Sequence, residues 1–174
     1  MDTYRPRNLR IFSYRTNRIM LHIEDMLDMG KIAVDLWQYS KGNGSSKHFT
    51  CYVDVDDMRL IAHQLLTGKL EPWTDYKGQA NKATGEIVAR VLRIEQATDT
   101  KIQGIRINCA AGPGTRLPTG AVKPAGKLDS LTALLPADEA LSMALAIREH
   151  LQAWATATYY ARKDECWKPE EDKS

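Results

Sequence analysis

Four short runs in which apolar and polar residues alternate follow one another between residues 9 and 55. A period of two predicts half-buried strands, because successive side chains of a strand point to opposite faces of its sheet. The runs are Leu9 to Arg15, Arg18 to Glu24, Lys31 to Tyr39 and His48 to Val55. Gly30 and the turn-forming segment Ser40 to Lys47 separate the last three runs, so the pattern predicts an antiparallel meander.

A short helix is predicted after the fourth run. Its apolar residues recur at intervals of three and four, the spacing of one helix face: Met58, Ile61, Ala62, Leu65 and Leu66. We expect Asp56 or Asp57 to cap the first turn and Gly68 to end the helix, since acidic residues cap helix starts and glycine often follows helix ends. The first half therefore reads as strands followed by a helix.

The same order returns after a polar stretch at residues 69–84, which we interpret as a linker. Three further strands are predicted, at Glu86 to Glu95, Ile102 to Cys109 and Lys127 to Leu135. Between the last two, residues 110–126 are rich in Gly and Pro and are predicted to form a long loop.

A long helix is predicted next, because Pro136 and Asp138 are typical of a helix start and an apolar stripe runs from Leu141 to Trp154. We therefore expect an α+β fold of two pseudo-repeats, each a multi-stranded antiparallel sheet followed by a helix. Residues 1–163 are expected to form a single domain, with repeat one at about 8–68, the linker at 69–84 and repeat two at about 85–163. Residues 164–174 form a polar tail.

The composition is that of one ordinary globular domain, with 174 residues of which 43% are hydrophobic and 26% charged. No apolar stretch approaches the ~18 residues needed to cross a bilayer, and the N-terminal segment lacks the apolar core of a signal peptide. Cys51, Cys109 and Cys166 are odd in number and far apart, which argues against a disulfide framework or a zinc cluster. We therefore expect a cytoplasmic protein with no membrane partner.

The formal net charge of +2 conceals two basic regions. Residues 1–18 hold five arginines and one aspartate, a net charge of +4. Residues 77–127 hold nine Lys or Arg residues and three Asp or Glu residues, a net charge of +6. Local positive charge of this kind suits the phosphates of a nucleic acid, although the overall charge does not decide the question.

Alternation also sorts the side chains of the first four strands into two sets. If the aliphatic set faces the helices, the other set consists of aromatic rings interleaved with polar and cationic groups: Arg10, Phe12, Tyr14, Arg18, Met20, His22, Trp37, Tyr39, His48 and Tyr52. Aromatic rings stack on bases for about 1 to 3 kcal/mol each and cations follow the phosphates, whatever the base sequence. The alternative is a second apolar layer that packs against another sheet or a partner subunit.

One segment of the second half resembles a known family. Gly85 to Gln96, Gly-Glu-Ile-Val-Ala-Arg-Val-Leu-Arg-Ile-Glu-Gln, is similar to the strand that opens the second repeat of the Whirly proteins, and Ile105 to Asn108 follows as their next strand does. In the order of elements, the resemblance extends from about Asn8 to Trp154. The chain lacks the short Lys-Gly-Lys-Ala-type segment of plant members, and residues 110–126 have no counterpart, so DNA contacts are not carried over by motif.

The resemblance implies the fold of single-stranded-DNA-binding transcriptional regulators. It also implies a homo-oligomer that assembles through its helices and presents its sheets outward.

The short motifs that resemble enzyme or metal sites do not have the residue spacing that those sites require. His22-Ile23-Glu24 lacks the cysteine half of the zinc-deaminase pattern, and Gly42 to Lys47 leads into a strand where a phosphate-binding loop needs a helix. Asp54, Asp56 and Asp57 lack the glycine and distal glutamate of a calcium loop and are better explained as a helix cap. We therefore expect no enzymatic activity, no metal and no cofactor.

Together these observations predict a protein that binds single-stranded nucleic acid with little sequence preference, DNA being a better candidate than RNA. Such a protein would serve DNA replication, recombination, repair or transcription regulation. The expected interface residues are Arg10, Phe12, Tyr14, Arg18, Trp37, Tyr39, Tyr52, Arg90, Arg93 and Arg106. A homo-oligomer through the C-terminal helix is expected as well. The alternative function is a protein-interaction or assembly module that binds no nucleic acid.

Overall fold

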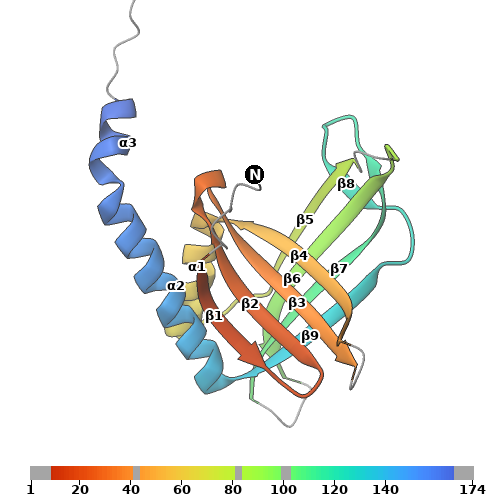
Figure 1. Cartoon of the computed structure of the whole chain (residues 1–174), viewed down its shortest axis with the longest axis horizontal. Helices are drawn as coiled ribbons and strands as arrows, with labels where there is room; N and C mark the ends of the chain where they lie inside the picture. Colours follow the sequence, from red (N-terminus) through yellow and green to blue (C-terminus); the bar gives the residue numbers. More distant parts are fainter. Residues whose placement is uncertain (1–8, 41–43, 81–83, 99–102, 167–174) are drawn as a thin grey trace, which may run out of the picture.

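Two antiparallel sheets lie at an angle to each other, and two main helices pack along them (Figure 1). The computed structural model describes residues 9–40, 44–80, 84–98 and 103–166. Arg5 and Arg7 of the basic N-terminal region, the centre of the turn predicted after β3 and most of the polar tail lie outside these residues.

The first sheet consists of β1 (Arg10–Arg15), β2 (Ile19–Met26), β3 (Lys31–Ser40) and β4 (Gly44–Asp54), paired in that order and all antiparallel. A 3-10 turn, Leu27–Met29, joins β2 to β3 and ends at Gly30, whose φ of 66° is left-handed. This backbone conformation favours glycine, because glycine has no Cβ atom that could clash with the neighbouring backbone. The predicted meander of four strands is confirmed.

The second sheet consists of β5 (Trp73–Ala80), β6 (Ile87–Ala97), β7 (Gly104–Arg116) and β9 (Asp129–Pro136), paired in that order. The short strand β8 (Val122–Pro124) pairs with the last three residues of β7. The interpretation of residues 69–84 as a linker is therefore wrong, because this stretch contains β5, an edge strand of the second sheet. The loop predicted at residues 110–126 is also wrong in large part, because β7 and β8 occupy much of it.

Both errors have a physical reason. The inward positions of β5 begin with Trp73 but continue with Asp75 and Lys77, so no apolar alternation marks the strand. In the case of the predicted loop, glycines on β5 and β7 leave room for β8 to pack. A Cβ atom on Gly78 would lie 2.4 Å from Val122, and one on Gly114 would lie 2.9 Å from it. The missing side chains allow β8 to fold across this end of the second sheet.

The first sheet leads into α1 (Val55–Leu66), and the second leads into α2 (Ala137–Ala157), which α3 (Tyr159–Cys166) extends. Asp54 caps α1 in place of the expected Asp56 or Asp57, and its side chain makes no capping hydrogen bond because Lys31 and Lys77 bind its carboxylate. Each repeat is thus an antiparallel sheet followed by a helix, with four strands in the first sheet and five, β8 included, in the second, and the predicted α+β architecture is confirmed. None of the helices in the described part of the chain is long and apolar enough to cross a membrane.

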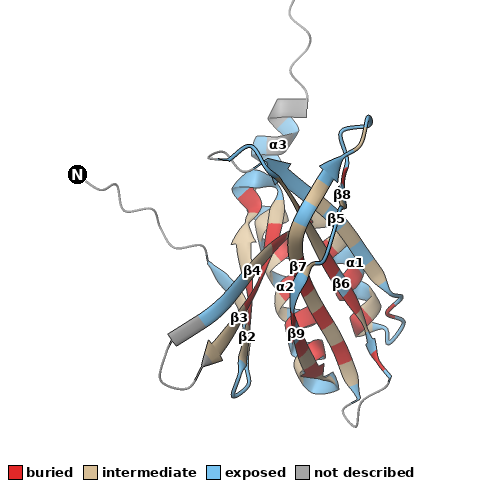
Figure 2. Ribbon diagram, turned by 90° about the vertical axis from the view of Figure 1, so that its right-hand side faces the viewer, coloured by how far each residue is buried: buried red, intermediate tan, exposed pale blue. Residues whose placement is uncertain are grey.

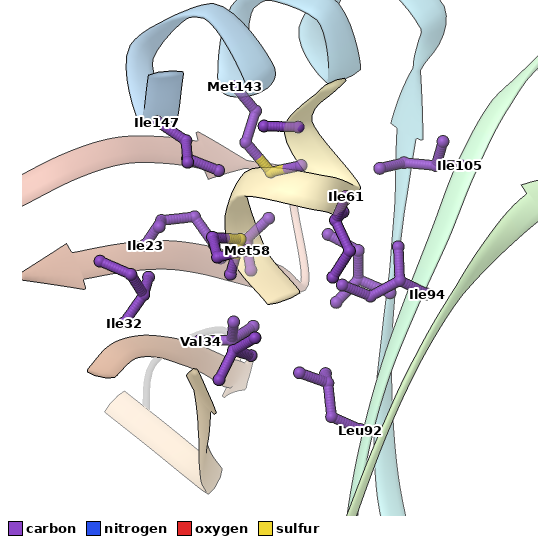
Figure 3. Close-up of a cluster of buried hydrophobic side chains, with 14 of the residues drawn as sticks. Ile23, Ile32, Val34, Met58, Ile61, Leu92, Ile94, Ile105, Met143 and Ile147 are labelled. Atoms are coloured by element: carbon purple, nitrogen blue, oxygen red, sulfur yellow. The ribbon is translucent and has the colours of Figure 1, made fainter. Parts of the chain in front are cut away.

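One hydrophobic core joins the two repeats, and buried residues occur on both sheets and on both main helices (Figure 2). Their side chains converge in this core (Figure 3). Ile23 of β2, Ile94 of β6, Ile61 of α1 and Ile147 of α2 are each at most 2% exposed. The helix α2 contacts β1 as well as β7 and β9, so it packs on both sheets. Because this core uses one face of each sheet, the other faces point outward.

Candidate nucleic-acid interface

The predicted interface residues of β1 do not share one face of the sheet. The pairing of β1 with β2 shifts between Arg10 and Phe12, so Ile11 is an extra residue that forms a β-bulge. The bulge reverses the alternation after it. Phe12 then lies opposite Ile23, and both Phe12 and Tyr14 pack against the core. The prediction that Phe12 and Tyr14 lie on the outward face is therefore wrong.

Tyr14 is half-buried and close to the first turn of α2. Burial raises the pKa of its phenol, and the carboxylates of Glu139 and Asp138 raise it further. The ring thus stays protonated and contributes to the packing of β1 on α2, so it offers nothing to a ligand on the outside of the sheet.

We call the side chains that alternate with the core residues of β1 to β4 the outer face of the first sheet. The register places the following residues on it: Arg10, Ser13, Arg15, Met20, His22, Glu24, Met26, Lys31, Ala33, Asp35, Trp37, Tyr39, His48, Thr50, Tyr52 and Asp54. Four predicted interface residues are therefore brought together: Arg10, Trp37, Tyr39 and Tyr52. Arg18 is exposed in the turn between β1 and β2, at one end of this face.

A pair of stacked rings lies on this outer face. Trp37 of β3 and His48 of β4 are directly opposite each other in the register, and their ring centres are 3.5 Å apart with an angle of 13° between the planes. The indole is half-buried, and its Nε1 has no hydrogen-bond partner among the described residues. The pair is a ready-made aromatic surface that does not belong to the core.

A cation and a second aromatic ring lie beside this stack. Tyr39 follows Trp37 on the same face of β3, and the guanidinium carbon of Arg15 lies 5.2 Å from the centre of its ring. The Tyr39 hydroxyl donates to Met20 Sδ at 2.7 Å, which fixes the ring against β2. Arg15 was not among the predicted interface residues, although it belongs to the basic region at residues 1–18, and the bulge at Ile11 places it on the outer face.

Polar side chains fill the centre of the outer face. Asp35 is only 8% exposed and accepts a hydrogen bond from the Thr50 hydroxyl, while His48 Nε2 lies 3.2 Å from Asp35 Oδ1. His22 is 5% exposed, and burial together with the charge of Arg10 lowers the pKa of its imidazole. His22 is therefore neutral at neutral pH, and its Nε2 has no partner among the described residues.

This polar cluster does not have the geometry of a hydrolytic triad. The same nitrogen, His48 Nε2, faces both the Thr50 hydroxyl at 3.1 Å and the Asp35 carboxylate, whereas a triad needs opposite ring nitrogens for the two contacts. The described residues also contain no group of three or more His, Cys, Asp or Glu side chains that could hold a metal ion.

The three arginines predicted from the second sheet lie on two different faces. Arg93 and Arg106 share Glu95 on the outward face, at 2.9 and 3.1 Å. Arg90 lies on the inward face of β6, two residues before the core residue Leu92 and therefore on the same side as that residue. Tyr76 of β5, which is 58% exposed, is an outward aromatic residue that the linker interpretation concealed.

Comparison with protein-family models finds no match, and comparison with curated proteins finds none. Solved structures do match. WHY1 of Arabidopsis thaliana superposes with a TM-score of 0.59 at 14% identity, over 96% of this chain and 99% of that one. The plant transcriptional regulator PBF-2 gives 0.56 at 14%, over 97% and 92%. WHY3 of Arabidopsis thaliana gives 0.59 at 16%, over 91% and 99%. The fold is that of the Whirly proteins.

The structural matches confirm both the expected fold class and the expected resemblance to the Whirly proteins. Sequence identities of 14 and 16% show the fold alone. The chemistry of the outer face follows from its own side chains, which are stacked aromatic rings with arginines beside them.

Proposed function

We propose that this protein binds single-stranded DNA with little sequence preference, on the outer face of its first sheet. The observation that carries the proposal is the stack of Trp37 and His48 with the pair of Arg15 and Tyr39 beside it. Rings of this kind provide stacking surfaces for bases, and Arg15 with the exposed Arg10 and Arg18 provides charges for phosphates. Neither contact distinguishes one base from another.

The Whirly fold supports this proposal, because one of the solved structures that share it is that of a plant transcriptional regulator. On the second sheet, Arg93 and Arg106 carry two positive charges against the one negative charge of Glu95, so this face adds to the attraction. Binding of this kind, in the cytoplasm, would serve DNA replication, recombination, repair or transcription regulation.

The dependence of binding on salt tests the proposed function. We expect the protein to bind single-stranded oligonucleotides at low salt and to lose affinity as salt rises. For single strands, the slope of log affinity against log salt is about −0.7 for each phosphate contacted, so contacts to Arg10, Arg15 and Arg18 would give about −2. A titration followed by fluorescence anisotropy, with a duplex of the same sequence as the control, measures it. Absence of binding at low salt, or a flat slope, would refute the proposal.

A second candidate function, self-assembly, is favoured by apolar side chains on the helices. Of the predicted stripe, Leu151 is buried and Trp154 packs on the core, so these two belong to the monomer. Leu141 and Leu145 of α2 remain 43% and 39% exposed, and Tyr160 of α3 is 74% exposed. Leu141 and Leu145 are four residues apart on α2 and therefore adjoin on its surface. Adjoining exposed apolar side chains are typical of a partner surface. We propose that a second copy of the chain covers them.

The molar mass in solution tests self-assembly. Multi-angle light scattering should give a multiple of the monomer mass of 19.6 kDa. Leu145→Arg places a charge in the proposed contact and should shift the mass toward the monomer, while Ser142→Arg, at an exposed polar position, serves as the matched control. A wild-type protein that stays monomeric at the highest soluble concentration would contradict the proposal.

A further inference from the structure

A cavity of about 270 Å³ lies where the edge strand of the first sheet meets the inward face of the second. Its charged lining comes from β3, β5 and β6, namely Lys31, Asp75, Lys77 and Arg90, and Cys51 and Tyr52 of β4 also line it. None of the contacts described so far for the outer face involves this cavity, but Lys31 and Tyr52 belong to that face by register and also line the cavity.

Two of the three cations in this cavity are neutralised. Lys31 and Lys77 both bind the carboxylate of Asp54, and Lys77 Nζ lies 2.8 Å from Asp54 Oδ2 and 3.1 Å from Asp75 Oδ2. Hydrogen bonds from the two lysines lower the pKa of Asp54. Burial lowers the pKa of Lys77, but its hydrogen bonds with Asp54 and Asp75 outweigh burial and leave the pKa raised. Asp54 and Lys77 are therefore both charged at neutral pH.

Arg90 is the cation without a counter-charge. Within the described part of the chain it makes no ion pair and no hydrogen bond. It also lies directly opposite Lys77 in the pairing of β5 with β6, and like charges at facing positions of neighbouring strands destabilise a sheet. The cavity therefore holds three cations against the carboxylates of Asp54 and Asp75. An anion beside Arg90 would remove the imbalance.

We propose that this cavity binds a phosphate group, with Arg90 as its main ligand. The planar guanidinium offers paired N–H donors that match the oxygen atoms of a phosphate, which a lysine ammonium does not. Tyr52 lies both on the outer face and in the cavity lining, so the two adjoin, and a strand bound on that face would be the source of the phosphate. In this respect the inference rests on the proposed function, since the bound strand supplies the phosphate.

The test compares Arg90→Gln with Arg59→Gln. Arg59 is an exposed arginine of α1 that pairs with Asp56 on the helix side, so its replacement removes the same charge far from the cavity. We expect Arg90→Gln to weaken binding of a single-stranded oligonucleotide by about tenfold, the loss of one charged hydrogen-bonding group. The slope of log affinity against log salt should become less steep by about 0.7, because one phosphate contact is lost. Arg59→Gln should bind like the wild type.

A second measurement uses inorganic phosphate in place of the strand. Sodium phosphate should raise the unfolding midpoint of the wild type above that in sodium chloride of equal ionic strength, and Arg90→Gln should lose this increment. The phosphate bound by the cavity could be the terminal phosphate of a strand or an internal one. Oligonucleotides with a 5′-phosphate and with a 5′-hydroxyl distinguish these two sources. A gain from the 5′-phosphate that depends on Arg90 assigns the cavity to the end of a strand, and equal binding assigns it to an internal phosphate.

The outcomes separate this inference from the proposed function. If the wild type binds the strand and Arg90→Gln binds equally well, the cavity does not hold a phosphate and the proposed function stands. If no strand binds but phosphate stabilises the wild type through Arg90, the proposed function fails and the cavity site stands. Arg90→Gln should fold, because it removes the like charge that faces Lys77. Arg90→Lys keeps the charge without the paired donors, and it should show a reduced phosphate increment. An increment equal to that of the wild type would overturn the role of the guanidinium.

Discussion

Replacing Trp37 with alanine should weaken binding of single-stranded DNA by about 5- to 150-fold, which corresponds to about 1 to 3 kcal/mol of lost base stacking. The substitution removes one ring of the stack with His48 and leaves the core intact, because Trp37 lies outside it. We therefore expect the circular-dichroism spectrum of the variant to match that of the wild type. Affinity is measured by the same anisotropy titration as for the wild type.

Tyr160→Ala is the control for this substitution, since it removes an exposed aromatic ring on α3, which extends from the helix side. It should bind DNA like the wild type, provided that its molar mass is unchanged. A Trp37→Ala variant that binds normally would remove the ring from the interface. A variant that loses its folded spectrum would show that the indole supports the fold and that its assignment to a binding surface is wrong.

Replacing Ile147 with alanine should lower the free energy of unfolding by about 2 to 5 kcal/mol, the usual cost of a cavity in a well-packed core. Ile147 is fully buried on α2, the helix that packs on both sheets. Because the two repeats share one core, we expect a single denaturation transition that moves as a whole. Urea denaturation followed by both fluorescence and circular dichroism checks this.

Leu145→Ala on the same helix truncates a similar side chain that is 39% exposed, and it should cost less than about 1 kcal/mol. Two separate transitions in Ile147→Ala would show that the repeats unfold independently, contrary to the shared core. A large loss in Leu145→Ala that depends on protein concentration would instead place Leu145 in a contact between copies.

The sequence predicted the first sheet well because its core residues alternate without interruption from β2 to β4. Ile23, Val34 and Cys51 are all buried, as the period of two requires. The prediction was wrong where a single residue changes the phase. The bulge at Ile11 leaves no mark in composition, yet it turns Phe12 and Tyr14 toward the core and Arg15 away from it.

The second sheet was harder to predict because charged side chains stand where an apolar pattern was sought. Asp75 and Lys77 occupy inward positions of β5, where the cavity beside Arg90 takes the place of packed core. Arg90 was predicted to lie with Arg93 and Arg106 because all three belong to the basic region at residues 77–127. The net charge of a region does not show on which face of a strand each side chain lies. The register of β6 separates them.

The strand β8 gives the second sheet a different exposed surface from the first, although both repeats are antiparallel sheets followed by a helix. Val122 occupies the space beside Gly78 and Gly114, and Ala89 between them is only 1% exposed, so the chain itself closes this end of the second sheet. Among the described residues, the first sheet has no fifth strand like β8. A nucleic-acid strand that crossed from one sheet to the other would leave an open surface and arrive at one that is half closed. Its 5′ and 3′ ends would then occupy inequivalent places, which gives the molecule a direction along the strand.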